Sequence, residues 1–213
     1  FVNWDSQKLN EFKADKIIKG KNKIVMPGLI NTHTHCAMTL LRNFADDYAL
    51  EEWLFEKIFP AENKLTPEDI YWGTTLGIIE MIKSGTTTFA DMYLHMDAVA
   101  QAVYETGIRA NLSRSPLRFN VGEDRETIDD RVQCIEYYKS WNSRGSGRIK
   151  VYIEVHSAYL FNKEELQSAA SLARELNTGV HIHLLETLKE RDDSIKKYGK
   201  SSVEVCEECG IFD

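Results

Sequence analysis

The stretch Pro27–His35 reads PGLINTHTH, and the rest of the chain is best interpreted outward from it. A short apolar run ends there in two histidines, His33 and His35, two positions apart. Side chains two apart on a β-strand point to the same side, so a strand here directs both imidazoles toward one point. Neutral imidazole is a good ligand for zinc and similar divalent ions. Taken alone, the pair also fits two hydrogen-bonded interior histidines, which is the commoner meaning of a bare HxH.

Four more apolar runs follow the first, and helical patterns lie between them. The helical segment that begins at Thr66 has a capping residue there, a proline at its first position and a glycine, Gly85, where it ends. Strands that alternate with helices predict a parallel sheet with right-handed crossovers. The five expected strands are 24–31, 86–92, 108–114, 149–156 and 179–185.

Two α/β layouts compete for this pattern, an open doubly wound sheet and a closed (β/α)8 barrel. The first strand is not followed by GxGxxG, so dinucleotide binding on a doubly wound sheet has no support. Polar residues gather instead where several strands end, as they do around barrel active sites. We therefore expect a (β/α)8 barrel of the metal-dependent hydrolase kind.

The length of the chain limits how much of that barrel it holds. Five βα units fall within residues 24–205, at about 36 residues each, whereas a complete barrel has eight units and about 250 residues. Residues 24–213 are therefore predicted to be a partial barrel that carries the catalytic groups, and the chain to be a fragment. Residues 1–23 are polar and weakly patterned, and we expect them to be the remnant of a small N-terminal β element.

Composition excludes several classes of protein. The 213 residues carry a net charge of −7 and are 43% hydrophobic, which is ordinary for a soluble globular protein. No basic stripe is present to neutralise phosphates, so nucleic acid is not an expected partner. No apolar run reaches the length of a membrane span, and no membrane partner is expected.

The four cysteines include one CxxC pair, Cys206 and Cys209. A zinc knuckle needs a second pair, and a thioredoxin-like pair opens a helix, whereas this pair ends a helical stretch. We expect four free thiols and a reducing, cytoplasmic location.

A second histidine cluster lies at the end of the fifth strand, in His181–Thr187. His183 faces inward nearest the strand end, and Glu186 just beyond it is either within reach of a metal-bound water or a solvated acid at a helix start. His181 faces the same way but lower in the barrel, and is interpreted as a satisfied core histidine. His156 ends the fourth strand and adds a third polar group to the same rim.

Several blocks of sequence, in one order, resemble a known family. The first is similar to the first-strand signature of the amidohydrolase superfamily. Together they resemble the 5-methylthioadenosine/S-adenosylhomocysteine deaminases within it. The blocks are Pro27–His35, Ala37–Arg42, Ala45–Asp47, Glu52–Leu54, Pro60–Glu62, Leu65–Asp69, Ser84–Tyr93 and His183–Thr187.

The resemblance implies a role for individual positions. His33, His35 and His183 match metal ligands, and Glu186 matches an acid that shuttles protons and holds the purine ring. Glu62 matches a carboxylate that binds ribose hydroxyls. The other substrate-binding positions that it implies are Arg114, Arg125, His156 and Trp53.

The implied reaction is hydrolytic deamination of adenine in a thioether nucleoside, with hydroxide attack and release of ammonia. It implies one divalent ion, zinc, with iron as the alternative, and a small purine nucleoside as the partner molecule. The family also uses a histidine at the end of strand six and an aspartate at the end of strand eight, which this chain does not reach. We therefore expect the fragment to be inactive alone, and self-association into a homo-oligomer stays open.

Two alternatives remain. One is another amidohydrolase of the same architecture, such as an s-triazine chlorohydrolase or a guanine or cytosine deaminase. Glu62 and Arg114 favour a nucleoside over these ring-only substrates, which have no ribose to hold. The other is a non-catalytic half-barrel that needs a partner, because an open parallel sheet leaves unpaired edges and exposed apolar surface.

Overall fold

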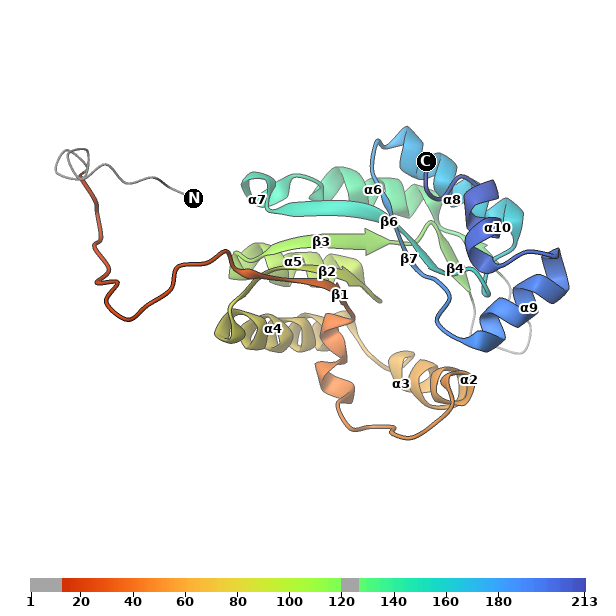
Figure 1. The fold of residues 1–213 in the computed structure, drawn as a ribbon, viewed down its shortest axis with the longest axis horizontal. Coiled ribbons are helices and arrows are strands. Elements are labelled where there is room, and N and C mark those ends of the chain that lie inside the picture. The colour runs from red at the N-terminus through yellow and green to blue at the C-terminus, as the bar shows by residue number, and fades with distance from the viewer. Residues whose placement is uncertain (1–12, 120–126) are drawn as a thin grey trace.

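A five-stranded parallel sheet organises the molecule (Figure 1). The computed structural model describes residues 13–119 and 127–213. The strands hydrogen-bond in the order β1-β2-β3-β6-β7, which is also their order along the chain. A doubly wound sheet would reverse direction at a switch point, so the unbroken order supports the barrel layout. The strands are β1 Leu29–Thr34, β2 Thr86–Met92, β3 Arg109–Arg114, β6 Ile149–Ser157 and β7 Val180–His183.

Helices follow the strands, and a short antiparallel pair, β4 Leu117–Phe119 with β5 Thr127–Asp129, lies beside the sheet. After β1 come the 3₁₀ turn η1 Cys36–Leu41, α2 Leu50–Glu52, the π-helical turn η2 Trp53–Ile58, α3 Phe59–Glu62 and α4 Pro67–Ser84. The remaining helices are α5 Met96–Thr106, α6 Arg131–Trp141, the four-residue α7 Arg144–Gly147, α8 Lys163–Glu175, α9 Leu188–Tyr198 and α10 Ser202–Glu208.

The two faces of the sheet differ in character, as β6 shows. Val151, Ile153 and Val155 are buried among helix side chains. Alternate residues of a strand point to opposite faces, so Glu154 and His156 lie on the other face, and both line a cavity. The helices therefore cover one face, and the second face carries the polar groups.

The sheet curls into a half-barrel, and the distance between its two edges measures the curl. Edge strands β1 and β7 would lie about 19 Å apart in a flat five-stranded sheet. Yet His33, on β1, has its Nε2 only 3.2 Å from Nε2 of His183 on β7. The inward faces of the edge strands therefore converge, which confirms the barrel prediction.

Helix boundaries follow the capping signals in the sequence. Thr66 accepts a hydrogen bond from the Asp69 amide while the Asp69 carboxylate accepts from Thr66, a complete capping box ahead of α4. Asn162 and Glu165 form the same arrangement ahead of α8. Gly85 ends α4 at φ +89°, a left-handed conformation that favours glycine.

Three details differ from the expected elements. The first strand begins at Leu29, and 24–28 are exposed coil, since parallel pairing with β2 starts at Leu29. Ile128 continues the helical spacing of Val132 and Ile135, which predicts that it lies on the same helix, but it lies in β5, paired with Arg118. Helix α9 was not predicted, because its exposed, charged sequence has too few apolar positions to show a helical period.

Residues 13–23 carry neither helix nor strand, and 1–12 lie outside the described residues, so the N-terminal β element stays a prediction. All four cysteines are free and buried, as expected. None of the helices within 13–119 and 127–213 combines the length and apolar character needed to cross a bilayer.

Candidate functional site

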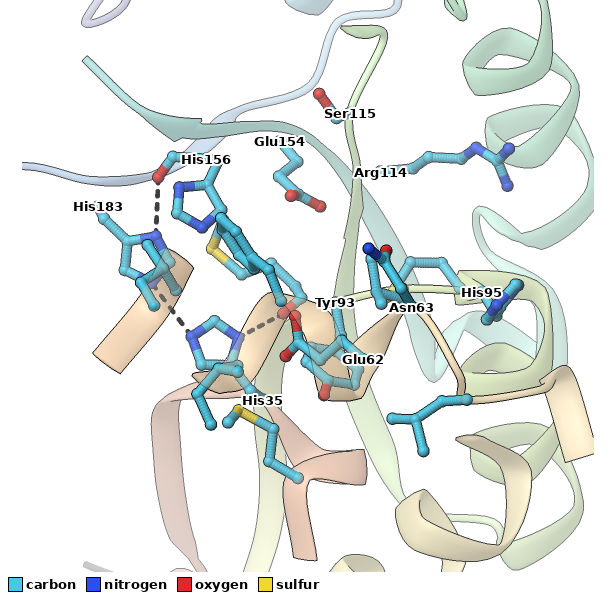
Figure 2. Close-up of a pocket in the computed structure, with 18 of the residues that line it drawn as sticks. His35, Glu62, Asn63, Tyr93, His95, Arg114, Ser115, Glu154, His156 and His183 are labelled. Atoms are coloured by element: carbon cyan, nitrogen blue, oxygen red, sulfur yellow. Dashed lines mark hydrogen bonds between the residues drawn. The ribbon is translucent and has the colours of Figure 1, made fainter. Parts of the chain in front are cut away.

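Three histidines converge where β1 and β7 end. The Nε2 atom of His183 lies 3.2 Å from Nε2 of His35 and 3.2 Å from Nε2 of His33. One nitrogen from each of the three rings lies within 4.8 Å of the others. The structure thus brings together the three predicted metal ligands from the two edges of the sheet (Figure 2 shows His35 and His183).

In two of these histidines the other ring nitrogen, Nδ1, is held by a backbone carbonyl oxygen. His35 Nδ1 lies 2.6 Å from the Met92 carbonyl and His183 Nδ1 lies 2.7 Å from the His156 carbonyl, as dashed lines show in Figure 2. A carbonyl only accepts, so each Nδ1 carries the hydrogen. In the neutral rings each Nε2 then offers its lone pair to the shared point.

The protonation state suits a metal site. Burial lowers the pKa of His35 to about 4, although its bond to the Met92 carbonyl opposes the shift. Burial also lowers the pKa of His33, followed by repulsion from His183. Neutral imidazoles that present three converging nitrogens fit the ligand chemistry of zinc, with positions left for other ligands.

A buried aspartate, Asp91 on β2, fixes the chain on both sides of His35. Its carboxylate accepts from the Thr34 hydroxyl at 3.0 Å and from the Cys36 amide at 3.0 Å. Burial raises its pKa to about 7, against the lowering effect of these hydrogen bonds. Sequence reasoning passed over Asp91, because an acid inside a strand gives no periodic signal.

A cavity of about 640 Å³ opens beside the histidines, a size typical of small-molecule sites. The predicted site residues on its wall are His35, His183, Glu186, Glu62, His156, Trp53 and Arg114. His33 joins the cluster from the edge of the sheet without lining the cavity.

Glu186 stands at the end of β7, on an exposed stretch whose backbone is braced. The buried carboxylate of Glu190 accepts from the Leu185 amide at 3.1 Å and from the Glu186 amide at 2.9 Å. Leu185 has φ +53°, a costly conformation for a branched residue and one that tends to occur at functional sites. The Tyr159 hydroxyl donates to the Glu186 carboxylate at 3.4 Å.

Glu62 is a buried acid on the cavity wall, only 7% exposed. Burial raises its pKa, and the nearby Tyr93 hydroxyl opposes the shift. Both side chains enter the same part of the pocket as His35 (Figure 2). A carboxylate held in this setting can accept hydrogen bonds from hydroxyl groups that displace water from it.

His156 and Trp53 lie on the wall in different ways. Burial lowers the pKa of His156 to about 3, followed by repulsion from His183, so its ring is neutral. Its ring centroid is 5.0 Å from that of His183. Trp53 donates from Nε1 to the Ala45 carbonyl at 3.2 Å, which anchors the indole at the cavity wall.

The structure describes the position of only one of the two predicted arginines, Arg114. Arg114 lines the cavity, but its guanidinium pairs with Asp97 at 3.1 Å and with Asp130 at 3.3 Å, and it points away from the histidines in Figure 2. Its substrate contact stays a prediction. Arg125 lies outside the described residues.

Two further polar groups lie on the inner face. His181 is hydrogen-bonded, as expected of a satisfied histidine, and its partners are the buried Ser113 and also His33 of the site. Sequence reasoning missed Glu154, which is 9% exposed and lines the cavity. The period of two along β6 could have found it, since it lies two residues before His156.

The comparisons with known proteins agree with this geometry. A 5-methylthioadenosine/S-adenosylhomocysteine deaminase of Acetivibrio thermocellus is 62% identical over the whole chain, which covers 48% of that protein. One of the same name from Thermoanaerobacter pseudethanolicus is 47% identical over 95% of the chain and 47% of its own length. The chain thus spans about half the length of the curated relatives that it matches.

A solved structure shares the fold. An adenosine deaminase from Xanthomonas campestris with bound zinc superposes with a TM-score of 0.78 at 32% identity, over 88% of this chain and 43% of its own. The family model described as the amidohydrolase family matches residues 24–213. Because this model matches residues 24–213 and the half-barrel has the same fold, the chain belongs to the amidohydrolase family.

Proposed function

We propose that this chain supplies the metal ligands and part of the substrate pocket of a hydrolytic deaminase that acts on the adenine of 5-methylthioadenosine or S-adenosylhomocysteine. The observation that carries the proposal is the convergence of three imidazole nitrogens, from His33, His35 and His183, beside a cavity whose wall holds Glu186 and Glu62. Because the chain spans about half of its relatives, the activity is proposed for the whole protein.

A bound zinc ion would supply Lewis-acid chemistry and lower the pKa of water from 15.7 to about 7. The proton transfers fall to Glu186, at the end of β7 on the cavity wall. Its carboxylate accepts one proton of the attacking water and delivers it to the purine ring nitrogen. It then transfers the remaining proton of that oxygen to the amino group, so that the carbon–nitrogen bond breaks and ammonia leaves as the carbonyl forms. The Tyr159 hydroxyl, 3.4 Å away, orients the carboxylate by hydrogen bonding.

The rest of the pocket holds the nucleoside in this proposal. Glu62 accepts from the ribose hydroxyls, which is why a nucleoside is favoured over a free base. The neutral ring of His156, at the end of β6, and the indole of Trp53, in η2, contact the substrate from the wall of the cavity. Arg114 and Arg125 are proposed to bind the thioether tail, and Arg114 would have to share its guanidinium with Asp97 and Asp130.

The remaining parts of the proposal concern the setting of the enzyme. We place it in the cytoplasm, because four free cysteines are typical of a reducing compartment. Zinc is preferred over iron, since a related structure contains it. A homo-oligomer is compatible with the exposed apolar side chains of β1 and α4, among them Ile30 at 66% and Trp72 at 58%.

Ammonia release by the complete gene product tests the substrate assignment. The panel is 5-methylthioadenosine, S-adenosylhomocysteine, adenosine, guanine, cytosine and an s-triazine. The proposal predicts the highest kcat/KM for a thioether nucleoside, and a Glu62→Gln variant that loses nucleoside turnover mainly through a higher KM. Turnover restricted to free bases or triazines would refute the nucleoside assignment while leaving the metal site in place.

A further inference from the structure

The three converging histidines are held from behind in two different ways. His35 and His183 each direct Nδ1 at a backbone carbonyl, from Met92 and His156. His33 differs, because within the described residues its Nδ1 meets a side chain instead of a carbonyl, namely Nε2 of His181 at 3.0 Å. One ring of the cluster therefore depends on another side chain for its orientation.

His181 is itself held in place from the far side. Its Nδ1 lies 2.9 Å from the hydroxyl oxygen of Ser113, which is fully buried on β3. The rings of His33 and His181 meet edge to face, with an interplanar angle of 88° and centroids 5.1 Å apart. A chain of three side chains thus runs from the sheet interior to the edge strand β1.

Hydrogen-bond chemistry fixes the direction of this chain. For His33 to offer the Nε2 lone pair toward His183, its hydrogen must sit on Nδ1. That hydrogen is donated to Nε2 of His181, so the hydrogen of His181 sits on Nδ1 and is donated to Ser113. Each neutral ring then has one donor and one acceptor nitrogen, and both are used.

The position of His181 on its strand argues against a packing role. Its neighbours Val180 and Ile182 pack against the hydrophobic core on the helix side. His181 lies on the opposite face of β7, the face that carries His183. His33 is exposed on the edge strand β1, and among the described residues His181 is the hydrogen-bond partner of its Nδ1, whereas His183 lies at its Nε2.

We propose that His181, anchored by Ser113, is a positioning residue that fixes the tautomer and orientation of His33, so that its Nε2 faces the same point as those of His35 and His183. The inference rests on the proposed metal site. It adds to that site a second layer of side chains, which in metal centres typically changes affinity by about 10- to 100-fold when removed.

The decisive variants distinguish the effect of the hydrogen bonds of His181 from the effect of its side-chain volume. His181→Leu keeps apolar bulk and removes both bonds. His181→Gln keeps an acceptor for His33 and a donor for Ser113. Ser113→Ala removes only the anchor, and Ser202→Ala is its matched control, because Ser202 is also buried but lies on α10 away from the site.

Two properties of these variants are measured. The first is zinc affinity, by competition with a chromophoric chelator. The second is the tautomer of His33 in the metal-free protein, from long-range ¹H–¹⁵N NMR correlations of its ring. Circular dichroism confirms that each variant is folded.

The proposal predicts a dominant Nδ1–H tautomer for His33 in the wild type and a mixture in His181→Leu. Zinc affinity should fall about 10- to 100-fold in His181→Leu, recover most of that loss in His181→Gln, fall only a few-fold in Ser113→Ala and stay unchanged in Ser202→Ala. A folded His181→Leu variant with wild-type affinity and an unchanged tautomer would overturn the proposal. So would a His181→Gln variant as weak as His181→Leu.

These outcomes are distinct from failure of the proposed function. A wild-type chain that binds no zinc contradicts the metal site itself. The tautomer measurement needs no metal, so it decides the role of His181 in either case.

Discussion

The helix-facing and cavity-facing sides of the same sheet obey different rules. On the helix side, Val151, Ile153 and Leu112 are buried among other apolar groups. On the cavity side the strands carry imidazoles and carboxyls. Burial there raises the pKa of Glu154 to about 8 and lowers the pKa of His156 to about 3. The helix-facing side stabilises the fold. The cavity-facing side keeps buried polar groups whose desolvation costs stability.

The comparison predicts that damage to the cavity face should affect chemistry without affecting folding. Glu186→Gln in the complete protein should lower kcat by about 10²–10⁴, equivalent to about 3–5 kcal/mol, because an amide cannot carry the proton. Zinc affinity and thermal stability should stay at wild-type values. Glu175→Gln, on the exposed end of α8, is the control and should leave kcat unchanged. A Glu186→Gln variant with near-normal kcat would remove the acid–base role from this residue.

A substitution on the helix-facing side should lower stability without greatly changing zinc binding. Leu112→Ala on β3 should lower the free energy of unfolding by about 2–5 kcal/mol, because the lost side chain leaves a cavity in a fully buried position. Urea titration of the chain measures this. Zinc affinity, measured under folding conditions, should remain within a few-fold of wild type. A loss below about 1 kcal/mol would show that the two faces share the stabilising role more evenly than we infer.

The buried carboxyl of Glu154 offers a sharper test, because its effect depends on pH. Burial raises its pKa to about 8, the charge of Asp91 adds to the shift and Arg114 opposes it. The folded protein therefore binds this proton more tightly than the unfolded chain, so stability falls as pH rises from about 4.3 to about 8.

Glu154→Gln removes this titration. Relative to wild type, the variant should gain on the order of 1–4 kcal/mol of unfolding free energy between pH 5 and pH 8, with the Asp91 contribution common to both proteins. Urea titrations across this pH range measure the difference. Parallel stability profiles for the two proteins would mean that Glu154 does not hold a proton more tightly when folded.

The smallest expected effect concerns a helix cap, which lies on neither face of the sheet. Thr66→Ala removes the side-chain cap of α4 and should cost about 1 kcal/mol of unfolding free energy. Thermal denaturation detects such a loss, and zinc affinity should not change. Thr75→Ala serves as the comparison, since its hydroxyl donates to the Tyr71 carbonyl within the same helix and caps no helix end. A Thr66→Ala effect no larger than that of Thr75→Ala would argue against the capping box.

Much of this division could be predicted from the sequence. The strands, their parallel order and the cap at Thr66 follow from period, propensity and turn residues, which act locally. The strand period places His33, His35 and His183 on the inner face, and it is the family resemblance that predicts them as metal ligands.

Other features could not be found this way because they depend on contacts across the sheet. The bond from His181 to His33 spans 148 residues, and Asp91 reaches the backbone of Cys36 across 55. The orientation of the Arg114 guanidinium toward Asp97 and Asp130 likewise depends on where α5 and α6 begin. The first strand was placed too early, since Ile24 and Val25 have strand-forming character but no partner strand beside them.

Zinc binding by single-alanine variants tests the central claim most directly. The claim is that His33, His35 and His183 form one metal site across the two edges of the half-barrel. The wild-type chain should bind one zinc ion, and alanine at any of the three positions should weaken binding by about 100-fold, since one of few ligands is lost. His95→Ala, at the start of α5, should bind as the wild type does. Zinc binding that survives at full affinity in the three variants, or is absent from the wild type, would contradict the account.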